Sequence, residues 1–123
     1  MNNQAAKGIL PINKPQGWTS FDVVNKIKHM LPKKTKVGHL GTLDPMATGV
    51  LLVTIGKATK LFDIMQQKTK RYVATFRFGV ETDSLDATGE IVKTDSKIVT
   101  LEQINAVLPK FVGKIEQIPP KFS

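Results

Sequence analysis

The segment from Gly38 to Gly49, which reads GHLGTLDPMATG, constrains this chain more than any other stretch. It places one carboxylate, Asp44, among three glycines and a histidine, and no helical or strand periodicity fits it. Glycine permits close backbone approach and proline fixes its neighbours, so loops that combine them hold reactive groups against ligands. The segment is therefore predicted to be a functional loop centred on Asp44.

The positive charge of the chain is concentrated around this loop. The net charge is +8, but residues 1–80 carry 13 Lys and Arg against three acids, whereas residues 81–123 carry five against seven. No acid occurs between Val23 and Leu43, and this stretch contains five lysines: Lys26, Lys28, Lys33, Lys34 and Lys36. This distribution favours an anionic partner, most simply nucleic acid, and the alternative is a solvated lysine surface that serves solubility.

The rest of the composition excludes several kinds of site. The chain has 123 residues, which suits one domain or part of one, and it contains no Cys, which excludes disulfides, zinc–thiolate sites and thiol nucleophiles. There is no membrane-spanning apolar run and no signal-peptide pattern, so the expected location is the cytoplasm. His29 and His39 lack metal-ligand spacing, and a P-loop does not match because Ala58 follows the Gly-Lys pair.

A strand, a turn and a helix are predicted before the loop. Residues 8–13 resemble a short strand whose proline suits an edge or a bulge, and residues 14–20 follow as a turn. Ser20 is expected to cap a helix of about three turns that ends at Pro32. The core face of this helix is expected to comprise Phe21, Val24, Ile27 and Leu31.

Two strands and a helix are predicted after the loop. Residues 50–55 form a continuous apolar run typical of a buried strand, and residues 58–67 are expected to form a helix. Residues 72–78 alternate strictly and predict a strand buried on one face. The expected inward residues are Leu61, Phe62 and Met65 on the helix, and Tyr72, Ala74, Phe76 and Phe78 on the strand.

The C-terminal part mixes a polar loop with a short strand and a helix. Asp83 and Asp86, in the loop 82–89, are expected to bond local backbone or a basic residue. A strand is expected around residues 90–93 and a helix over residues 100–108, with Thr100 and Gln103 spaced as a capping box. These patterns predict an α+β fold with a mixed, largely antiparallel sheet and flanking helices. Without a termination signal after Ile115, the chain is expected to be the first part of something longer.

Five segments resemble the TruB family of tRNA pseudouridine synthases, in family order. They are Lys14-Pro15 with Gly17 and Thr19-Ser20, the block Gly38–Leu51, Lys70-Arg71-Tyr72, Thr82-Asp83 through Gly89, and Gln117-Ile118-Pro119-Pro120. The resemblance implies that residues 1–123 are the N-terminal portion of the pseudouridine synthase catalytic domain. The thumb-like insertion, the rest of the catalytic domain and the C-terminal RNA-binding domain would then be absent. Phe122 stands where the family usually has tyrosine.

The resemblance also implies an activity, the isomerisation of uridine 55 in the T loop of tRNA from an N-glycoside to a C-glycoside. Asp44 matches the catalytic aspartate of the family. A carboxylate with a reference pKa of about 3.9 is ionised at neutral pH and acts as a nucleophile without an activating base. Without the surrounding block, an aspartate in a Leu-Asp-Pro turn is more often a turn former. No metal or cofactor is expected.

Other site residues follow from the same resemblance. Tyr72 matches the tyrosine that stacks on the target base, and His39 matches the histidine that supports the flipped-out conformation of the T loop. Lys14 and Pro15 match a segment that supports the catalytic loop, and a plain surface lysine is the alternative for Lys14. The charge distribution, separately from the resemblance, predicts contacts to the RNA backbone from Lys33, Lys34 and Lys36.

The expected partner is the T stem-loop of tRNA, and the full-length enzyme is expected to be a monomer that binds no membrane. In the family, an arginine beyond the matched segments pairs with the catalytic aspartate, so this chain alone is expected to be inactive. Two alternatives stay open: a non-catalytic tRNA-binding or tRNA-folding module, and a guide-RNA-dependent relative. A T-loop methyltransferase is excluded because its chemistry uses a cysteine nucleophile.

Overall fold

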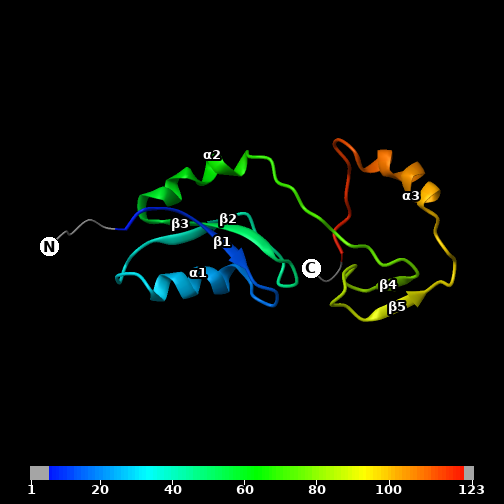
Figure 1. The fold of residues 1–123 in the computed structure, drawn as a ribbon, viewed down its shortest axis with the longest axis horizontal. Helices are drawn as coiled ribbons and strands as arrows, with labels where there is room; N and C mark the ends of the chain where they lie inside the picture. The colour runs from blue at the N-terminus through cyan, green and yellow to red at the C-terminus, as the bar shows by residue number, and fades with distance from the viewer. Residues whose placement is uncertain (1–5, 121–123) are drawn as a thin grey trace. The chain divides into compact units, whose positions relative to one another are not determined.

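The computed structural model describes residues 6–120, so Phe122 lies outside the described residues. The chain divides into two compact units, Met1–Arg71 and Tyr72–Ser123, called unit 1 and unit 2 below. Helices and antiparallel sheets together make an α+β fold, as predicted (Figure 1). Among residues 6–120, no helix has the length and apolar character that a membrane span requires.

Unit 1 is built on a three-stranded antiparallel sheet in the order β1-β3-β2. The strands are β1 (Gly8–Lys14), β2 (Val37–Leu40) and β3 (Gly49–Ile55) (Figure 1). β1 pairs with the whole of β3, and Lys14 lies opposite Gly49. The predicted edge strand is therefore confirmed, because Pro11 lies in an outer strand where a missing N–H is tolerated.

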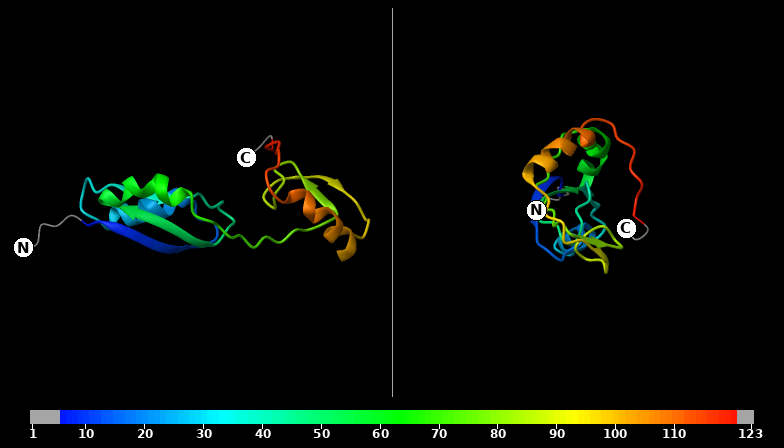
Figure 2. Two further views of the ribbon diagram at one scale, coloured as in Figure 1. Left: turned by 90° about the horizontal axis from the view of Figure 1, so that it is seen from above. Right: turned by 90° about the vertical axis from the view of Figure 1, so that its right-hand side faces the viewer.

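Helix α1 (Ser20–His29) packs against this sheet (Figures 1 and 2). Val23 and Ile27 of α1 form the core with Leu51 and Val53 of β3. Burial of these side chains gives the hydrophobic stabilisation of the unit. The helix is thereby fixed on the sheet, and its first residue lies beside the chain that leads to Asp44.

The start and the buried face of α1 differ from the prediction. The N-cap is Thr19, whose hydroxyl accepts from the Asp22 N–H at 3.0 Å, while the Asp22 carboxylate accepts from the Thr19 N–H at 2.8 Å. The prediction of Ser20 as the cap was wrong, because this reciprocal capping box needs an acid three residues after the cap. Phe21, predicted to be in the core, is 68% exposed, and the helix ends at His29.

The glycine segment is shorter as a loop than predicted. Strand β2 pairs with β3 up to Leu40 opposite Leu52, and β3 begins at Gly49, so the loop comprises residues 41–48. The prediction that no strand fits residues 38–49 was wrong at both ends of the segment. Glycines obscure the alternating pattern of a strand in the sequence, whereas hydrogen bonds between β2 and β3 satisfy the backbone N–H and C=O groups there. Gly41 has φ +75, a left-handed conformation that glycine adopts without strain.

The helix predicted after β3 is confirmed in part. The chain forms a 3-10 helix, η1 (Gly56–Leu61), and then a short α-helix, α2 (Phe62–Gln66). Met65 is half-buried, whereas Leu61 and Phe62 are exposed, so the expected inward face is wrong for those two residues. The tighter 3-10 turn changes the side-chain directions that a regular 3.6-residue period assumes.

Unit 2 contains a two-stranded antiparallel sheet and a helix. Strand β4 (Val80–Thr82) pairs with β5 (Ile91–Thr94), close to the predicted strand. Helix α3 (Leu101–Val107) has the predicted capping box between Thr100 and Gln103, and a 3-10 helix, η2 (Leu108–Phe111), follows it. These predictions depended on signals a few residues apart, which do not require distant contacts.

The strand predicted over residues 72–78 is absent. The segment from Tyr72 to Arg77 has no regular secondary structure, and Tyr72 and Phe76 are 64% and 77% exposed. Alternation defines a face, but a strand also needs a neighbour to satisfy its N–H and C=O groups. Within the part of the chain that the structure describes, no strand pairs with this segment.

Candidate active site

Asp44 lies in the loop 41–48 of unit 1 with its side chain exposed. Its backbone carbonyl accepts a hydrogen bond from the Ala47 N–H at 2.9 Å, which closes a turn. Among the hydrogen bonds of residues 6–120, none ends on the Asp44 carboxylate. The loop therefore presents a carboxylate to the surroundings while its backbone makes the structural bonds.

Lys14 ties the turn after β1 to this loop. Its side chain is fully buried, and its Nζ donates to the carbonyls of Trp18 at 2.6 Å, Pro15 at 3.0 Å and Pro45 at 3.2 Å. Three acceptors match the three donors of an ammonium group. The alternative of a plain surface lysine is wrong, because these carbonyls replace the water that a buried ammonium loses.

A backbone bond reinforces the same connection. The Gly17 N–H donates to the Pro45 carbonyl at 2.7 Å, so this carbonyl accepts from both Gly17 and Lys14. Gly17 has φ +86, which the turn requires and which side chains other than hydrogen disfavour. The residue after Asp44 is thus held by the turn between β1 and α1.

The residue before Asp44 is held by Ser20. The Leu43 N–H donates to Ser20 Oγ at 2.9 Å, and Ser20 Oγ donates to the Leu43 carbonyl at 3.2 Å. Ser20 is 3% exposed. This role of Ser20 was not predicted, because Ser20 was expected to be the helix cap. The three-residue spacing of Thr19 and Asp22 in the sequence could have indicated that Thr19 is the cap. The Ser20 hydroxyl is then available for a different hydrogen bond.

His39 lies in β2, opposite Val53, and is half-buried. Its Nδ1 is 2.6 Å from the Gly41 carbonyl, at the start of the loop. A carbonyl only accepts, so the proton lies on Nδ1 and the ring is oriented by this bond. His39 thereby keeps Nε2 as the ring nitrogen for a further contact.

The remaining predicted residues occupy two different places. Tyr72 is the first residue of unit 2 and is exposed, so the structure does not group it with the loop of unit 1. Lys33, Lys34 and Lys36 are exposed between α1 and β2, where the Thr35 N–H donates to the Pro32 carbonyl at 3.2 Å. This turn presents the lysines to solvent.

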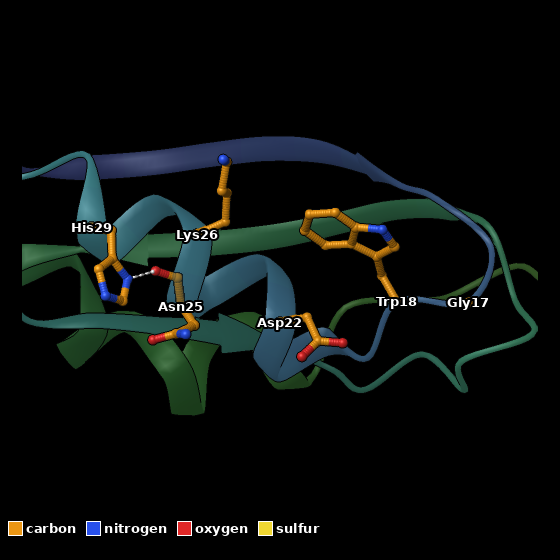
Figure 3. A pocket seen from close by; sticks show the side chains of 6 residues that line it. All are labelled: Gly17, Trp18, Asp22, Asn25, Lys26 and His29. Atoms are coloured by element: carbon orange, nitrogen blue, oxygen red, sulfur yellow. Dashed lines mark hydrogen bonds between the residues drawn. The ribbon is translucent and has the colours of Figure 1, made fainter.

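A hollow of about 480 Å³ on the exposed side of α1 involves none of the predicted site residues (Figure 3). One of its side chains is already engaged, since His29 Nδ1 lies 2.7 Å from the Asn25 carbonyl. The charges of Asp22 and Lys26 in its lining offset each other, so the hollow has no net positive charge to bind an anion. The lining residues are Gly17, Trp18, Asp22, Asn25, Lys26 and His29.

The Asp22 carboxylate of this lining has a lowered pKa because the Thr19 backbone N–H and hydroxyl hydrogen-bond to its charged form. That carboxylate serves the capping box. Within residues 6–120, no cluster of three or more His, Asp or Glu side chains could hold a metal ion. The chemistry that the described site offers is that of an exposed carboxylate on a fixed loop.

Comparisons with known proteins agree on one family. The sequence profile of the TruB family pseudouridylate synthase (N terminal domain) matches residues 28–123. The tRNA pseudouridine synthase B of Clostridium kluyveri is 49% identical over 116 residues, which cover 94% of this chain and 40% of that protein. The protein of the same name from Gloeothece citriformis is 53% identical over 117 residues, covering 94% and 37%.

A third relative, tRNA pseudouridine synthase B of Parabacteroides distasonis, is 50% identical over 121 residues, covering 94% of this chain and 52% of the relative. The chain therefore spans between 37% and 52% of the length of these three relatives. The profile match includes β2, the loop 41–48 and all of unit 2. On this match, the chain belongs to the TruB family of pseudouridylate synthases, and its residues 28–123 match the N-terminal domain of that family.

Proposed function

We propose that the protein is a tRNA pseudouridine-55 synthase in which Asp44 is the nucleophile that acts on uridine 55 of the T loop. The observation that carries the proposal is the loop itself: Leu43 and Pro45 are both held by the segment between β1 and α1, while the carboxylate between them is exposed. The names of the relatives support tRNA as the substrate.

The proposed reaction balances without another reactant. In the product, the ribose C1′ is bonded to C5 of the base in place of N1. The C1′–N1 bond breaks and a C1′–C5 bond forms, while C5 loses a proton and N1 gains one. A nucleophile that holds the separated ribose or base during the rotation is sufficient, and a carboxylate provides it without prior activation.

The fixed backbone contributes through pre-organisation. A reactive group held in position before the substrate binds avoids the reorganisation that would otherwise raise the barrier. The bonds from Lys14 and Ser20 hold the neighbours of Asp44 and so restrict the backbone from which its carboxylate projects. Asp44 is the catalytic residue of the proposal, and the bonds to its neighbours position it.

RNA binding is assigned to residues outside the loop backbone. The target uridine must leave its stack before a side chain can reach it, which costs stacking free energy. Stacking of the base on an aromatic side chain recovers roughly 1 to 3 kcal/mol of that free energy per base. We assign this stacking to Tyr72, and contact with the T loop to His39. Lys33, Lys34 and Lys36 would contact phosphates, because they are exposed and no acid lies near them in sequence.

The proposal assigns the rest of the pocket to regions present in the longer relatives. These regions would supply the arginine that pairs with Asp44 and the remaining RNA-binding surface. Residues 1–123 alone are therefore expected to isomerise T-loop uridine little or not at all. Stoichiometric conversion by residues 1–123 would contradict this assignment.

The test is the Asp44→Asn variant of the full-length protein, incubated with a tRNA transcript and followed by mass spectrometry of the T loop. Pseudouridine formation should fall by at least about 1,000-fold, because loss of a catalytic nucleophile has effects of that size or larger. Binding of tRNA should persist. Product formation that survives the substitution, or modification at a different uridine, would contradict the proposal.

A non-catalytic tRNA-binding module is the second candidate, and the exposed lysines between α1 and β2 favour it. This candidate predicts tight tRNA binding and no isomerisation by the unsubstituted full-length protein. A guide-RNA-dependent relative predicts isomerisation only when a guide RNA is added. The same assay, run with and without guide RNA, therefore separates all three hypotheses.

A further inference from the structure

The geometry points to Ser20 as a positioning residue for Asp44, acting through the Leu43 backbone. The inference concerns the backbone from which the carboxylate projects, and its kinetic consequence rests on the proposed function. Ser20 is the first residue of α1 and is 3% exposed. It lies 23 positions before the residue that it holds.

Both hydrogen-bonding capacities of the hydroxyl are used on one residue. Ser20 Oγ accepts from the Leu43 N–H at 2.9 Å and donates to the Leu43 carbonyl at 3.2 Å. A hydroxyl has one hydrogen and two lone pairs, so it can make both bonds together. Because both backbone groups of Leu43 are engaged, rotation about its φ and ψ is restricted, and the position of the next Cα, that of Asp44, is restricted with it.

The helix does not need this hydroxyl for its own stability. Thr19 and Asp22 already form the capping box, and Val23 and Ile27 hold α1 in the core. The Ser20 hydroxyl is therefore attached to a rigid element but bonds outside it. A support of this kind fixes a functional group better than a bond within the loop itself would.

Ser20 acts on one side of Asp44 only. Pro45, on the other side, is held by Lys14 Nζ and by the Gly17 N–H. Removing the Ser20 hydroxyl should thus leave the loop attached but allow the carboxylate to move. A nucleophile that is misplaced in a loop that still binds RNA lowers the chemical rate and leaves substrate affinity largely unchanged.

The kinetic test compares Ser20→Ala with Thr19→Ala in the full-length protein. Ser20→Ala should lower the single-turnover rate of pseudouridine formation by about 10- to 100-fold, with tRNA affinity within about twofold, since a displacement of about 1 Å has effects of that size. Ser20→Thr keeps the hydroxyl and should recover most of the rate.

Thr19→Ala is the matched control, because it removes the neighbouring hydroxyl and one of the two capping-box bonds but leaves the bonds between Ser20 and Leu43 intact. Its rate should stay within about twofold of the unsubstituted protein, as expected of a substitution that changes helix stability alone. An equal loss of rate in both variants would show that α1 stability is responsible, and would overturn the assignment of Ser20.

A second measurement does not depend on activity. The Leu43 amide of Ser20→Ala should exchange its hydrogen at least about 10-fold faster, because its only acceptor among the described bonds is lost, while the Ala47 amide serves as reference. Unchanged Leu43 exchange would overturn the inference even in an inactive protein. An inactive unsubstituted protein with the expected exchange result would instead count against the proposed function alone.

Discussion

Units 1 and 2 differ in where their apolar side chains lie. Every buried residue of the described chain belongs to unit 1, including Leu51 and Val53 with at most 1% exposure. Unit 2 has defined strands and a capped helix, but none of its residues up to 120 is buried. Its exposed apolar residues include Phe76, Phe78, Ile91, Val92, Ile98, Leu101, Phe111, Val112 and Ile118.

Local hydrogen bonds account for the order in unit 2. Asp83 accepts from the Glu90 N–H at 2.9 Å, and Asp86 accepts from Ser84 Oγ at 2.7 Å and from the Thr88 N–H at 2.8 Å. The prediction that these two acids bond locally is confirmed. Short-range polar signals thus define helices, strands and turns, whereas a stable unit also needs apolar surface removed from water.

The largest expected difference concerns matched leucines. Leu51→Ala in unit 1 should lower the free energy of unfolding by about 2–5 kcal/mol, because it leaves a cavity in the core. Leu101→Ala in unit 2 should change it by no more than about 0.5 kcal/mol, because Leu101 is 72% exposed. Urea denaturation of both variants measures the contrast. Equal effects would mean that unit 2 has a core in solution.

A second prediction concerns the segment 72–78, whose exposed aromatic residues alternate as in a half-buried strand. We expect the remaining regions of the longer relatives to pair with it. Joining this chain to the region of the Clostridium kluyveri protein beyond the match should therefore slow amide exchange of residues 73–77 by about 100-fold, as strand pairing does. Unchanged exchange in a folded chimera would show that the segment stays unpaired.

The smallest expected effect is a pH response shared by the two units. Hydrogen bonds lower the pKa of Asp22, chiefly from the Thr19 backbone, and that of Asp86, chiefly from the Thr88 hydroxyl. A carboxylate whose pKa is lower in the folded state stabilises the fold at pH values above its unfolded pKa of about 3.9. That stabilisation is lost as the pH falls through the pKa of the folded state. Both carboxylates are fully exposed, so the change should be small.

Amide chemical shifts of Thr19 and Thr88 across an acid titration measure this response. Both should change with midpoints below the usual aspartate value, and Asp22→Asn or Asp86→Asn should abolish the change at one site only. A transition in unit 1 alone would indicate that the local bonds of unit 2 are not formed in solution. That result would sharpen the contrast between the units.

Signals between neighbouring residues predicted several elements, but contacts between distant segments could not be read from the sequence. The capping box of Thr100 and Gln103 was predictable because its residues are three positions apart, and the outer position of β1 because Pro11 lacks an N–H. The strand predicted from the alternation of residues 72–78 was wrong, because a strand also requires a hydrogen-bonding partner, which an alternating pattern does not reveal. Phe21 fits a helical apolar stripe but lies just outside the side of α1 that meets the sheet.

In the candidate site, too, features set by neighbouring residues were predictable and contacts between distant segments were not. Asp44 was identifiable from its loop, and its role stays a prediction. The burial of Lys14 could not be read from the sequence, because one of its three acceptors is the Pro45 carbonyl, 31 positions away. The role of Ser20 was not predicted because Thr19 and Ser20 are both suitable N-cap residues. Only Asp22, three residues after Thr19, identifies Thr19 as the cap.

The attachment of the loop to the turn between β1 and α1 has a consequence for engineering. The conformation of the glycine segment is encoded largely by Lys14, Gly17 and Ser20, which lie outside it. A transplant of residues 38–49 into another scaffold would include the aspartate but not the hydrogen bonds that hold its neighbours in position. The smallest portable unit of this site is the discontinuous pair of segments, 14–20 together with 38–49.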